Sequence, residues 1–127
     1  MVLSINDFIW VMNADGTNRT QLTVGGAGSR DYPVWSPDGS RIAYLFDGNG
    51  FEPPSINVIN ADGGNQRQLT FLSSDGGIDW SPDGSKIVFS SFDGNGENIY
   101  VMNADGTSQT AITNRADRNF HPKWSPR

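Results

Sequence analysis

The chain has 127 residues, of which 35% are hydrophobic and 18% charged, and its formal net charge is −5. This balance indicates one folded unit with a modest core and excludes an intrinsically disordered chain. Because the chain is acidic and has neither a Lys/Arg cluster nor a long apolar run, we expect no nucleic-acid partner and no membrane insertion.

Short strands are the first elements expected along the chain. The runs MVLS at 1–4 and FIWVMN at 8–13 are rich in apolar and β-forming residues, and a third strand carries Gln-Leu-Thr at 21–23. Residues 1–10 lack the basic start, apolar run and cleavage site of a signal peptide, so the sequence leaves the compartment open. Cysteine is absent, which excludes disulfides and thiolate metal sites.

The following segments repeat each other. WSPDGSRIAYLF at 35–46 returns as WSPDGSKIVFSSF at 80–92, and NADG begins at Asn13, Asn60 and Asn103. The Trp-Ser-Pro anchors recur about every 45 residues, a period typical of four-stranded propeller blades or of helical repeats. The runs between the anchors are short and lack helical spacing, so the period indicates strands.

Tight turns separate these strands. In Ser36-Pro37-Asp38-Gly39, proline sets φ at the second position and glycine accepts the left-handed conformation at the fourth. The NADG segments follow the same logic, and their Asn side chains are expected to close Asx turns. Each full period therefore holds four antiparallel strands: A ends at Trp-Ser-Pro, B follows Pro-Asp-Gly, C precedes Asn-Ala-Asp-Gly, and D carries Gln-Leu-Thr.

These repeated sequence motifs resemble the PD40 repeat of TolB-like β-propellers. The match rests on Trp-Ser-Pro-Asp-Gly-Ser-Arg/Lys-Ile in both full repeats, Asp-Gly-Asn-Gly at 47–50 and 93–96, and Ile-Tyr-Val-Met-Asn-Ala-Asp-Gly-Thr at 99–107. The resemblance covers nearly the whole chain and implies an all-β propeller. It also implies a six-bladed ring and a periplasmic or extracytoplasmic setting. The roles it implies are protein interaction and service as the lid of a peptidase.

Counting strands gives the order B-C-D, A-B-C-D, A-B-C-D, A. We therefore interpret the chain as a single propeller unit, with strands B-C-D at 1–23, full blades at about 31–70 and 76–113, and a last strand A at 120–125. Three blades are too few for an ordinary closed ring, and an unpaired edge strand is a template for pairing. Strand A of one chain is thus expected to join strand B of a second copy, which gives a homodimeric six-bladed propeller. The residues expected to form this joint are Met1, Val2, Leu3, Ser4, Phe120, His121, Pro122, Lys123 and Trp124.

Candidate binding residues lie in the D–A loops, which lead to the mouth of the central channel. They are Asp31, Asp75, Asp117, Arg30, Arg118 and His121. His121, the only histidine, aligns with Tyr32 and Gly77 near the start of strand A. We expect a protein or peptide to bind at this mouth. The aligned Trp35, Trp80 and Trp124 are interpreted as core residues between blades.

The sequence offers no catalytic set. It has no Gly-x-Ser-x-Gly elbow, and its single histidine has no activated serine beside it. The loops that hold Asp47, Asn49 and Glu52, and Asp93, Asn95 and Glu97, place oxygen ligands close together. Their spacing differs from an EF-hand and between the two copies, so we interpret them as polar hairpin loops. We predict no cofactor, and the one exception considered is Ca²⁺ or another cation in the channel.

The preferred interpretation is a non-catalytic interaction scaffold, assembled from two chains, with a binding surface around the channel. Two alternatives stay open. The chain is a fragment of a longer TolB-like or peptidase-associated propeller, or it is a metal-dependent propeller hydrolase. Fold alone does not separate these functions, since one fold supports many.

Overall fold

The computed structural model describes residues 1–48, 50–70, 73–74, 77–94, 96–114 and 121–126, with the backbone alone at 73–74. The described residues form twelve strands and no helix. The strands are β1 (Val2–Ile5), β2 (Phe8–Val11), β3 (Thr20–Gln21), β4 (Ser29–Trp35), β5 (Arg41–Asp47), β6 (Ser55–Asn60), β7 (Arg67–Gln68), β8 (Ser73–Ser74), β9 (Asp79–Trp80), β10 (Lys86–Phe92), β11 (Glu97–Asn103) and β12 (Thr110–Ala111).

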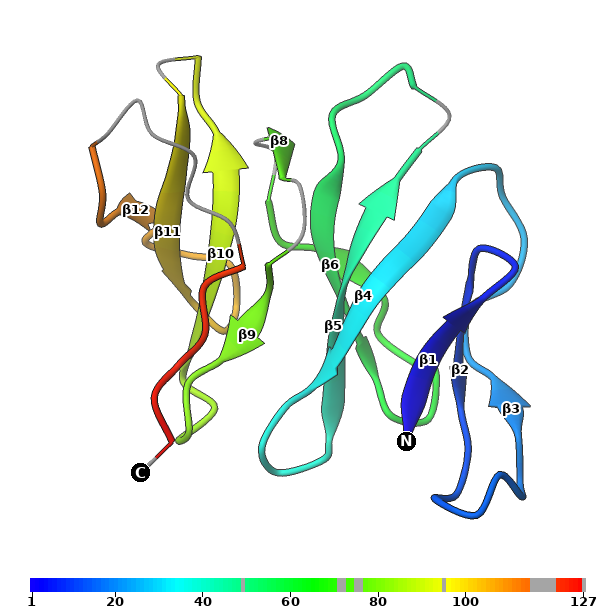
Figure 1. Ribbon diagram of the computed structural model, residues 1–127. Coiled ribbons are helices and arrows are strands. Elements are labelled where there is room, and N and C mark those ends of the chain that lie inside the picture. The colour runs from blue at the N-terminus through cyan, green and yellow to red at the C-terminus, as the bar shows by residue number, and fades with distance from the viewer. Residues whose placement is uncertain (49, 71–72, 75–76, 95, 115–120, 127) are drawn as a thin grey trace.

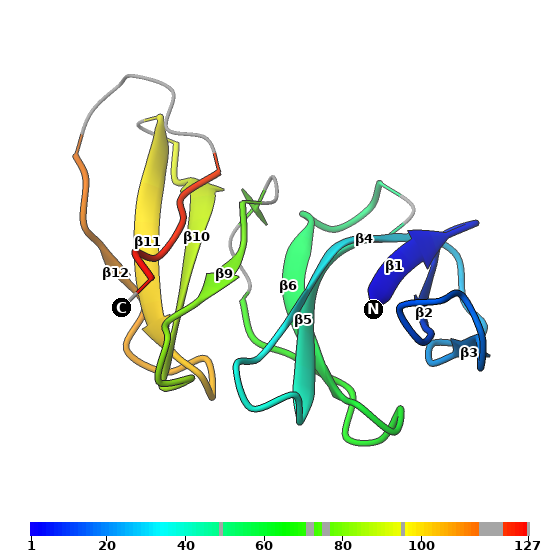
Figure 2. The same cartoon turned by 60° about the horizontal axis from the view of Figure 1, so that its bottom comes forward.

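The strands build three antiparallel sheets that stand side by side (Figures 1 and 2). Blade 1 has the order β1-β2-β3, and blade 2 has the order β4-β5-β6-β7. In blade 3 the order is β12-β11-β10-β8, and β9 also pairs with β10. The predicted all-β fold is confirmed, and three such sheets fit part of a propeller. The described part of the chain contains no helix of the length and apolarity needed to cross a membrane.

The Pro-Asp-Gly segments form the tight turns expected from their sequence. Ser36 N–H donates to Arg41 O at 2.8 Å, and Gly39 adopts a φ of 71°. The Asp38 Oδ1 atom accepts from the hydroxyl of Ser36 at 2.7 Å and from the amide of Ser40 at 3.0 Å. These hydrogen bonds, the one from Ser36 first, lower the pKa of Asp38 to about 2. The turn that begins at Ser81 repeats the same pattern.

The NADG turns correct one detail of the expectation. The Asp side chain, and not the Asn side chain, closes the Asx turn: Thr17 N–H donates to Asp15 Oδ1 at 2.9 Å. The Asn13 side chain instead donates from Nδ2 to Thr17 Oγ1 at 3.0 Å, across the base of the loop. The Asn amide is therefore used to bridge the two ends of the loop, while the Asp carboxylate supplies the acceptor of the Asx turn.

Two apolar clusters fill the spaces between the blades. One joins blade 1 to blade 2 and contains the buried residues Ile9, Ile42, Tyr44 and Ile59. The other joins blade 2 to blade 3 and includes Ala43, Val58, Trp80, Phe89 and Met102. Because alternate residues of β5 enter different clusters, blade 2 buries both of its faces, as a propeller requires.

Candidate functional site

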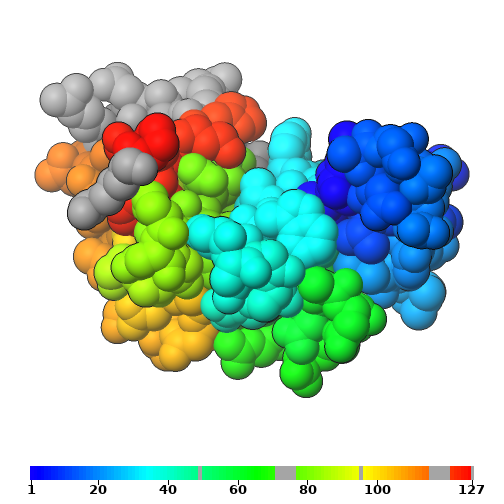
Figure 3. Space-filling view, turned by 90° about the horizontal axis from the view of Figure 1, so that it is seen from below, coloured from blue at the N-terminus to red at the C-terminus, as the bar shows by residue number. Residues whose placement is uncertain are grey.

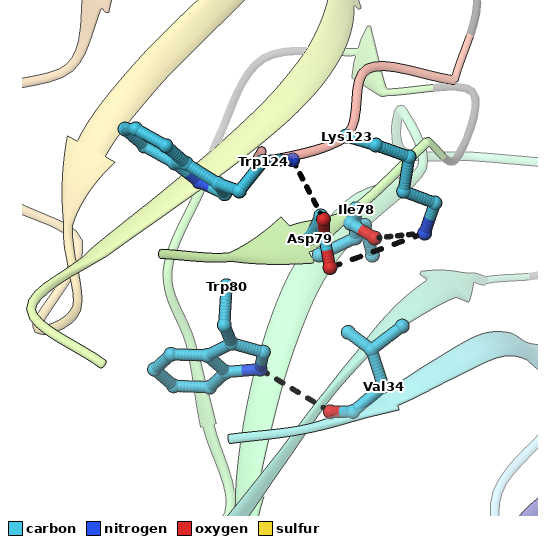
Figure 4. Close-up of polar contacts among 6 residues, drawn as sticks. All are labelled: Val34, Ile78, Asp79, Trp80, Lys123 and Trp124. Carbon is cyan, nitrogen blue, oxygen red and sulfur yellow. Dashed lines mark hydrogen bonds and ion pairs between the residues drawn. The ribbon is translucent and has the colours of Figure 1, made fainter. Parts of the chain in front are cut away.

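Segments that contain the repeated tryptophans connect the first, inner strands of neighbouring blades, which are β4 in blade 2 and β9 in blade 3 (Figure 4). Trp80 Nε1–H of β9 donates to Val34 O of β4 at 3.2 Å. The next segment, residues 121–126, lies against β9 through a different hydrogen bond, in which the backbone N–H of Trp124 donates to Asp79 Oδ2 at 2.8 Å. Lys123 Nζ is 3.5 Å from Ile78 O and 4.0 Å from Asp79 Oδ1. Residues 121–126 therefore lie beside β9, where the repeat would place strand A of a further blade.

The inner strands share a left-handed residue at the aligned position. Tyr32, Gly77 and His121 have φ values of 52°, 60° and 54°, and the register of β4 shifts between Asp31 and Val34. The Tyr32 and His121 rings lie 6.3 Å apart. A Cβ atom on Gly77 would lie 2.8 Å from His121 Cα, so only glycine lets residues 121–126 pack against blade 3.

Residues 121–126 are not in a strand in the single chain, and Phe120 lies outside the described residues. Figure 3 shows the segment, in red, against blade 3 on the side of the molecule away from blade 1. Trp124 is half-buried, and its Nε1 atom is buried with no hydrogen-bond partner in the described part of the chain. The pairing of this segment with a strand B stays a prediction.

Strand β1 has an open edge. Among the described strands it pairs with β2 alone, and Met1 exchanges two backbone hydrogen bonds with Met12, at 3.0 and 2.8 Å. Antiparallel pairs alternate between bonded and non-bonded positions, so the backbone groups of Val2 and Ser4 point away from β2. In complete blades this edge is occupied: Ala43 of β5 lies opposite Val34 of β4.

The outer face of blade 1 is also uncovered. Met1 aligns with Ile42 and Ile87, which are fully buried, yet Met1 is 58% exposed. The same difference is found at Leu3, Trp10 and Met12. Each of these residues is half-buried in blade 1, whereas the residues at the equivalent positions of blades 2 and 3 are buried. Blade 1 thus presents the apolar face that blades 2 and 3 bury against a neighbour.

Arg30, one of the predicted channel-mouth residues, is buried. Its guanidinium donates to the carbonyl oxygens of Gly25 at 2.9 Å, Gly28 at 3.1 Å and Asp7 at 3.3 Å. It also lies 5.0 Å from the centre of the Phe46 ring. The structure therefore gives Arg30 the role of a clamp between the turn of blade 1 and the loop that enters blade 2.

The remaining predicted binding residues are dispersed or undescribed. Asp31 is half-buried, with Oδ1 3.2 Å from the hydroxyl of Ser4, and His121 is exposed. The other three predicted residues lie outside the described residues: Asp75, Asp117 and Arg118. Binding at the channel mouth stays a prediction.

The Asp-Gly-Asn-Gly loop of blade 3 is built by hydrogen bonds between side chains. Asp93 Oδ2 accepts from Tyr100 Oη at 2.9 Å and from Asn98 Nδ2 at 3.1 Å. Desolvation of the Tyr100 hydroxyl, followed by its bond to Asp93, raises its pKa. Asn49 and Asn95 lie outside the described residues. Within the described ranges, no three His, Asp or Glu side chains gather closely enough to hold a metal ion.

A cavity of about 330 Å³, not predicted from the sequence, lies on blade 2 beside the loop that joins β6 to β7. It is lined by Arg41, Val58, Asn60, Asn65, Gln66 and Arg67. The signal that could have found it is a departure from the repeat: blade 2 has Gly64 where the other blades have Thr17 and Thr107.

Comparison with curated proteins gives relatives over most of the chain, although no family model matches. The chain is 48% identical over 89 residues to the Tol-Pal system protein TolB of Geobacter metallireducens, an alignment that covers 70% of this chain and 20% of the relative. It is 33% identical over 94 residues to an uncharacterized peptidase of Bacillus subtilis, covering 72% of this chain and 14% of the peptidase. The chain therefore spans a fifth or less of these relatives.

Solved structures agree with this relationship. TolB from Acinetobacter baumannii matches with a TM-score of 0.76 and 20% identity, over 89% of this chain and 30% of that one. A protein of Agrobacterium tumefaciens, provisionally named TolB, matches with a TM-score of 0.72 and 27% identity, over 84% and 40%. The chain is TolB-like. The same propeller fold occurs in an oligogalacturonate lyase in complex with manganese, with a TM-score of 0.68 and 25% identity, over 85% of this TolB-like chain and 29% of the lyase.

Proposed function

We propose that this TolB-like chain is a non-catalytic protein-interaction scaffold and that two copies close one six-bladed propeller. The observations that support the proposal are that β1 has an open edge and that residues 121–126 lie against β9, where the repeat would place a further strand A. One copy would supply the inner strand, and the other would supply β1 beside it. The channel mouth of the closed ring, near Asp31 and His121, is the proposed surface for a protein or peptide.

The complete blades fix the register of the proposed joint. In blade 3, Ile87 lies opposite Trp80 and Val88 lies opposite Asp79. The equivalent pairs across the joint are Met1 opposite Trp124 and Val2 opposite Lys123 of the second copy. Val2 directs its N–H and C=O toward this edge, so it can form both ladder bonds.

The joint also brings two apolar faces together. In the second copy, the outward face of blade 3 carries Val88, Ile99 and Val101, the equivalents of Ala43, Ile56 and Val58, which face blade 3 within this chain. The half-buried face of blade 1 that contains Met1 and Leu3 would cover it. Burial of apolar area on both sides of two such joints supplies the driving force for assembly.

The mass of the pure chain in solution tests the assembly. Size-exclusion chromatography with light scattering should give twice the mass of one chain at micromolar concentration. A folded monomer at these concentrations would refute the homodimer.

A proline at the open edge makes the test specific. Val2→Pro removes the N–H that points to the joint and leaves the β1–β2 ladder intact, so it should give a folded monomer. Val2→Ala keeps this N–H and serves as the matched control, which should remain a dimer. A dimeric Val2→Pro variant would contradict the proposed pairing.

One alternative has support from the comparisons. The chain matches a fifth or less of its TolB and peptidase relatives, which favours a segment of a longer propeller in which other blades cover both open faces. In that case the chain alone stays monomeric, and added flanking blades raise its stability. The mass measurement thus separates the two proposals.

A further inference from the structure

The cavity on blade 2 is formed by three adjacent strands. Arg41 begins β5, Val58 and Asn60 lie in the second half of β6, and Arg67 begins β7. Asn65 and Gln66 of the loop before β7 complete the lining. A second hollow of similar size, lined in part by Asp62, shares Arg41 and Asn60 with it. The site is therefore an open depression on blade 2, and none of the predicted channel-mouth residues lines it.

The strand register places the two arginines on one face. Arg41 lies opposite Asn60, and Arg67 lies opposite Val58. Opposite residues share a face of an antiparallel sheet, as do alternate residues of one strand, so these four side chains point to the same side. Since β6 separates the two arginines, their strands run about 10 Å apart with the cavity between their side chains.

Blade 2 lacks a side-chain hydrogen bond between Asn and Thr that blades 1 and 3 form at the equivalent turn. In the other blades an Asn amide donates to a Thr hydroxyl at 3.0 Å: Asn13 to Thr17, and Asn103 to Thr107. Gly64 takes the place of the Thr in blade 2. Within the described residues the Asn60 amide makes no side-chain hydrogen bond, and it lines both hollows. The Asn60 amide, whose equivalents in the other two blades are bonded within the turn, therefore lines the cavity as a hydrogen-bond donor.

The guanidinium groups are available as well. Arg41 Cζ lies 5.0 Å from the centre of the Trp80 ring, which holds the group in place and leaves its N–H edges accessible. In the described part of the chain the only ion pair joins Lys123 and Asp79, so neither Arg41 nor Arg67 is paired.

Three carboxylates of neighbouring turns face these arginines. Asp38 accepts from Ser40 N and Asp105 accepts from Thr107 N, each at 3.0 Å. Asp62 accepts from Gly64 N at 2.8 Å. Each carboxylate accepts these hydrogen bonds at its Oδ1 atom, and within the described residues none of the three forms an ion pair with Arg41 or Arg67. The pKa values of Asp38 and Asp105 are lowered first by hydroxyl bonds from Ser36 and Thr107, and further by the charges of Arg41 and Arg67.

We propose that this cavity binds the carboxylate side chains of an acidic, extended peptide segment of a partner protein. A guanidinium fork matches a carboxylate in two parallel hydrogen bonds, and the Asn60 amide adds a third donor. Alternate residues of an extended peptide stand about 7 Å apart, so two Glu side chains on one side of it reach both Arg41 and Arg67. The proposal does not depend on ring closure, since all of its groups lie in blade 2 and on Trp80.

The test is an NMR titration of the full chain with acetyl-Gly-Glu-Gly-Glu-Gly-amide. Saturable shifts should appear at the side chains of Arg41, Arg67 and Asn60, and the same peptide with Gln in place of Glu should cause none. Equal binding of the two peptides, or shifts confined to other blades, would overturn the proposal.

Two variants refine the assignment. Arg67→Gln should weaken binding about tenfold, because it removes one charge-assisted pair. Gly64→Thr supplies the hydroxyl present in the other blades, and its Cβ would lie 3.1 Å from Asp62 Oδ1, the atom its hydroxyl would bond. This variant should weaken binding about fivefold, since one neutral hydrogen bond is at stake, while the melting temperature stays the same or rises.

Arg19→Gln is the matched control, because Arg19 lies over the Trp10 ring of blade 1, outside the cavity. Its affinity should equal that of the unchanged chain. Undiminished binding by Arg67→Gln, or an Arg19→Gln loss as large as that of Arg67→Gln, would show that the peptide responds to overall charge and would refute the site.

Discussion

Asp79 links the last inner segment to blade 3, and its removal probes the proposed joint. Asp79 Oδ2 accepts the Trp124 N–H at 2.8 Å, and 26% of the Asp79 side chain is exposed. A hydrogen bond to a charged group contributes about 1.5 to 3 kcal/mol, and partial exposure favours the lower value. A ring closed by two copies contains this contact twice. Because this contact forms within each chain, Asp79→Ala is expected to release residues 121–126 from blade 3 before dimerisation. Ordering the segment again at both joints would then cost about 3 kcal/mol per dimer, which corresponds to a roughly 150-fold weaker dimer.

Sedimentation velocity over a dilution series measures this change in dissociation constant. Lys123→Gln is the control, because the Lys123 side chain is 63% exposed and its nitrogen lies 4.0 Å from Asp79 Oδ1. Such surface pairs contribute little, so this variant should shift the constant less than about fivefold. An Asp79→Ala chain that dimerises like the unchanged protein would refute the argument. A thermal melt of each variant separates a weakened joint from an unfolded blade.

Two further predictions concern stability. Arg30→Met should lower the free energy of unfolding by about 2 kcal/mol, because three carbonyl groups lose a charged donor; urea denaturation measures it, and a change below about 0.5 kcal/mol would contradict the clamp. The carboxyls of Asp38 and Asp83 have pKa values lowered from 3.8 to about 2, first by hydroxyl bonds from Ser36 and Ser81. A lowered pKa stabilises the fold above the ordinary value and loses this contribution as the pH falls toward 2. The melting temperature should drop between pH 4 and pH 2, and a double Ser36→Ala, Ser81→Ala variant should flatten that drop.

The local structure of the blades follows from short-range chemistry, which explains why the sequence predicts it. Proline and glycine restrict the backbone at Pro37 and Gly39, and Asp38 completes the turn with its own side chain. The alignment of Tyr32, Gly77 and His121 near the start of strand A agrees with their shared left-handed backbone, because a repeated sequence produces a repeated geometry. These features need no knowledge of distant residues.

The contacts that depend on distant segments were not predictable in the same way. In the sequence, Arg30 is a charged residue in a loop. The three carbonyl groups that accept its hydrogen bonds come from the turn at Asp7 and from the loop at 25–28, so the local sequence does not predict that they meet at Arg30. The cavity beside Arg41 likewise requires the register of β5, β6 and β7. Its only trace in the sequence is Gly64, and a single glycine is too common in turns to identify a site by itself.

Blade 3 has a neighbouring blade on one side and an open hollow at the equivalent positions on the other. Toward blade 2, Arg41 lies on Trp80, and a Cβ on Gly84 would be 3.6 Å from Pro37 Cδ, so the turns of the two blades touch. On the other side, the equivalent positions border a hollow of about 400 Å³, lined by Ser81, Pro82, Asp83, Ser85, Lys86, Trp124 and Ser125. By the repeat, this hollow is where the turn after strand A of a further blade would pack. In the proposed dimer, β1 of one copy would pair with residues 121–126 of the other and border this hollow, so the open edge and the hollow would belong to the same joint.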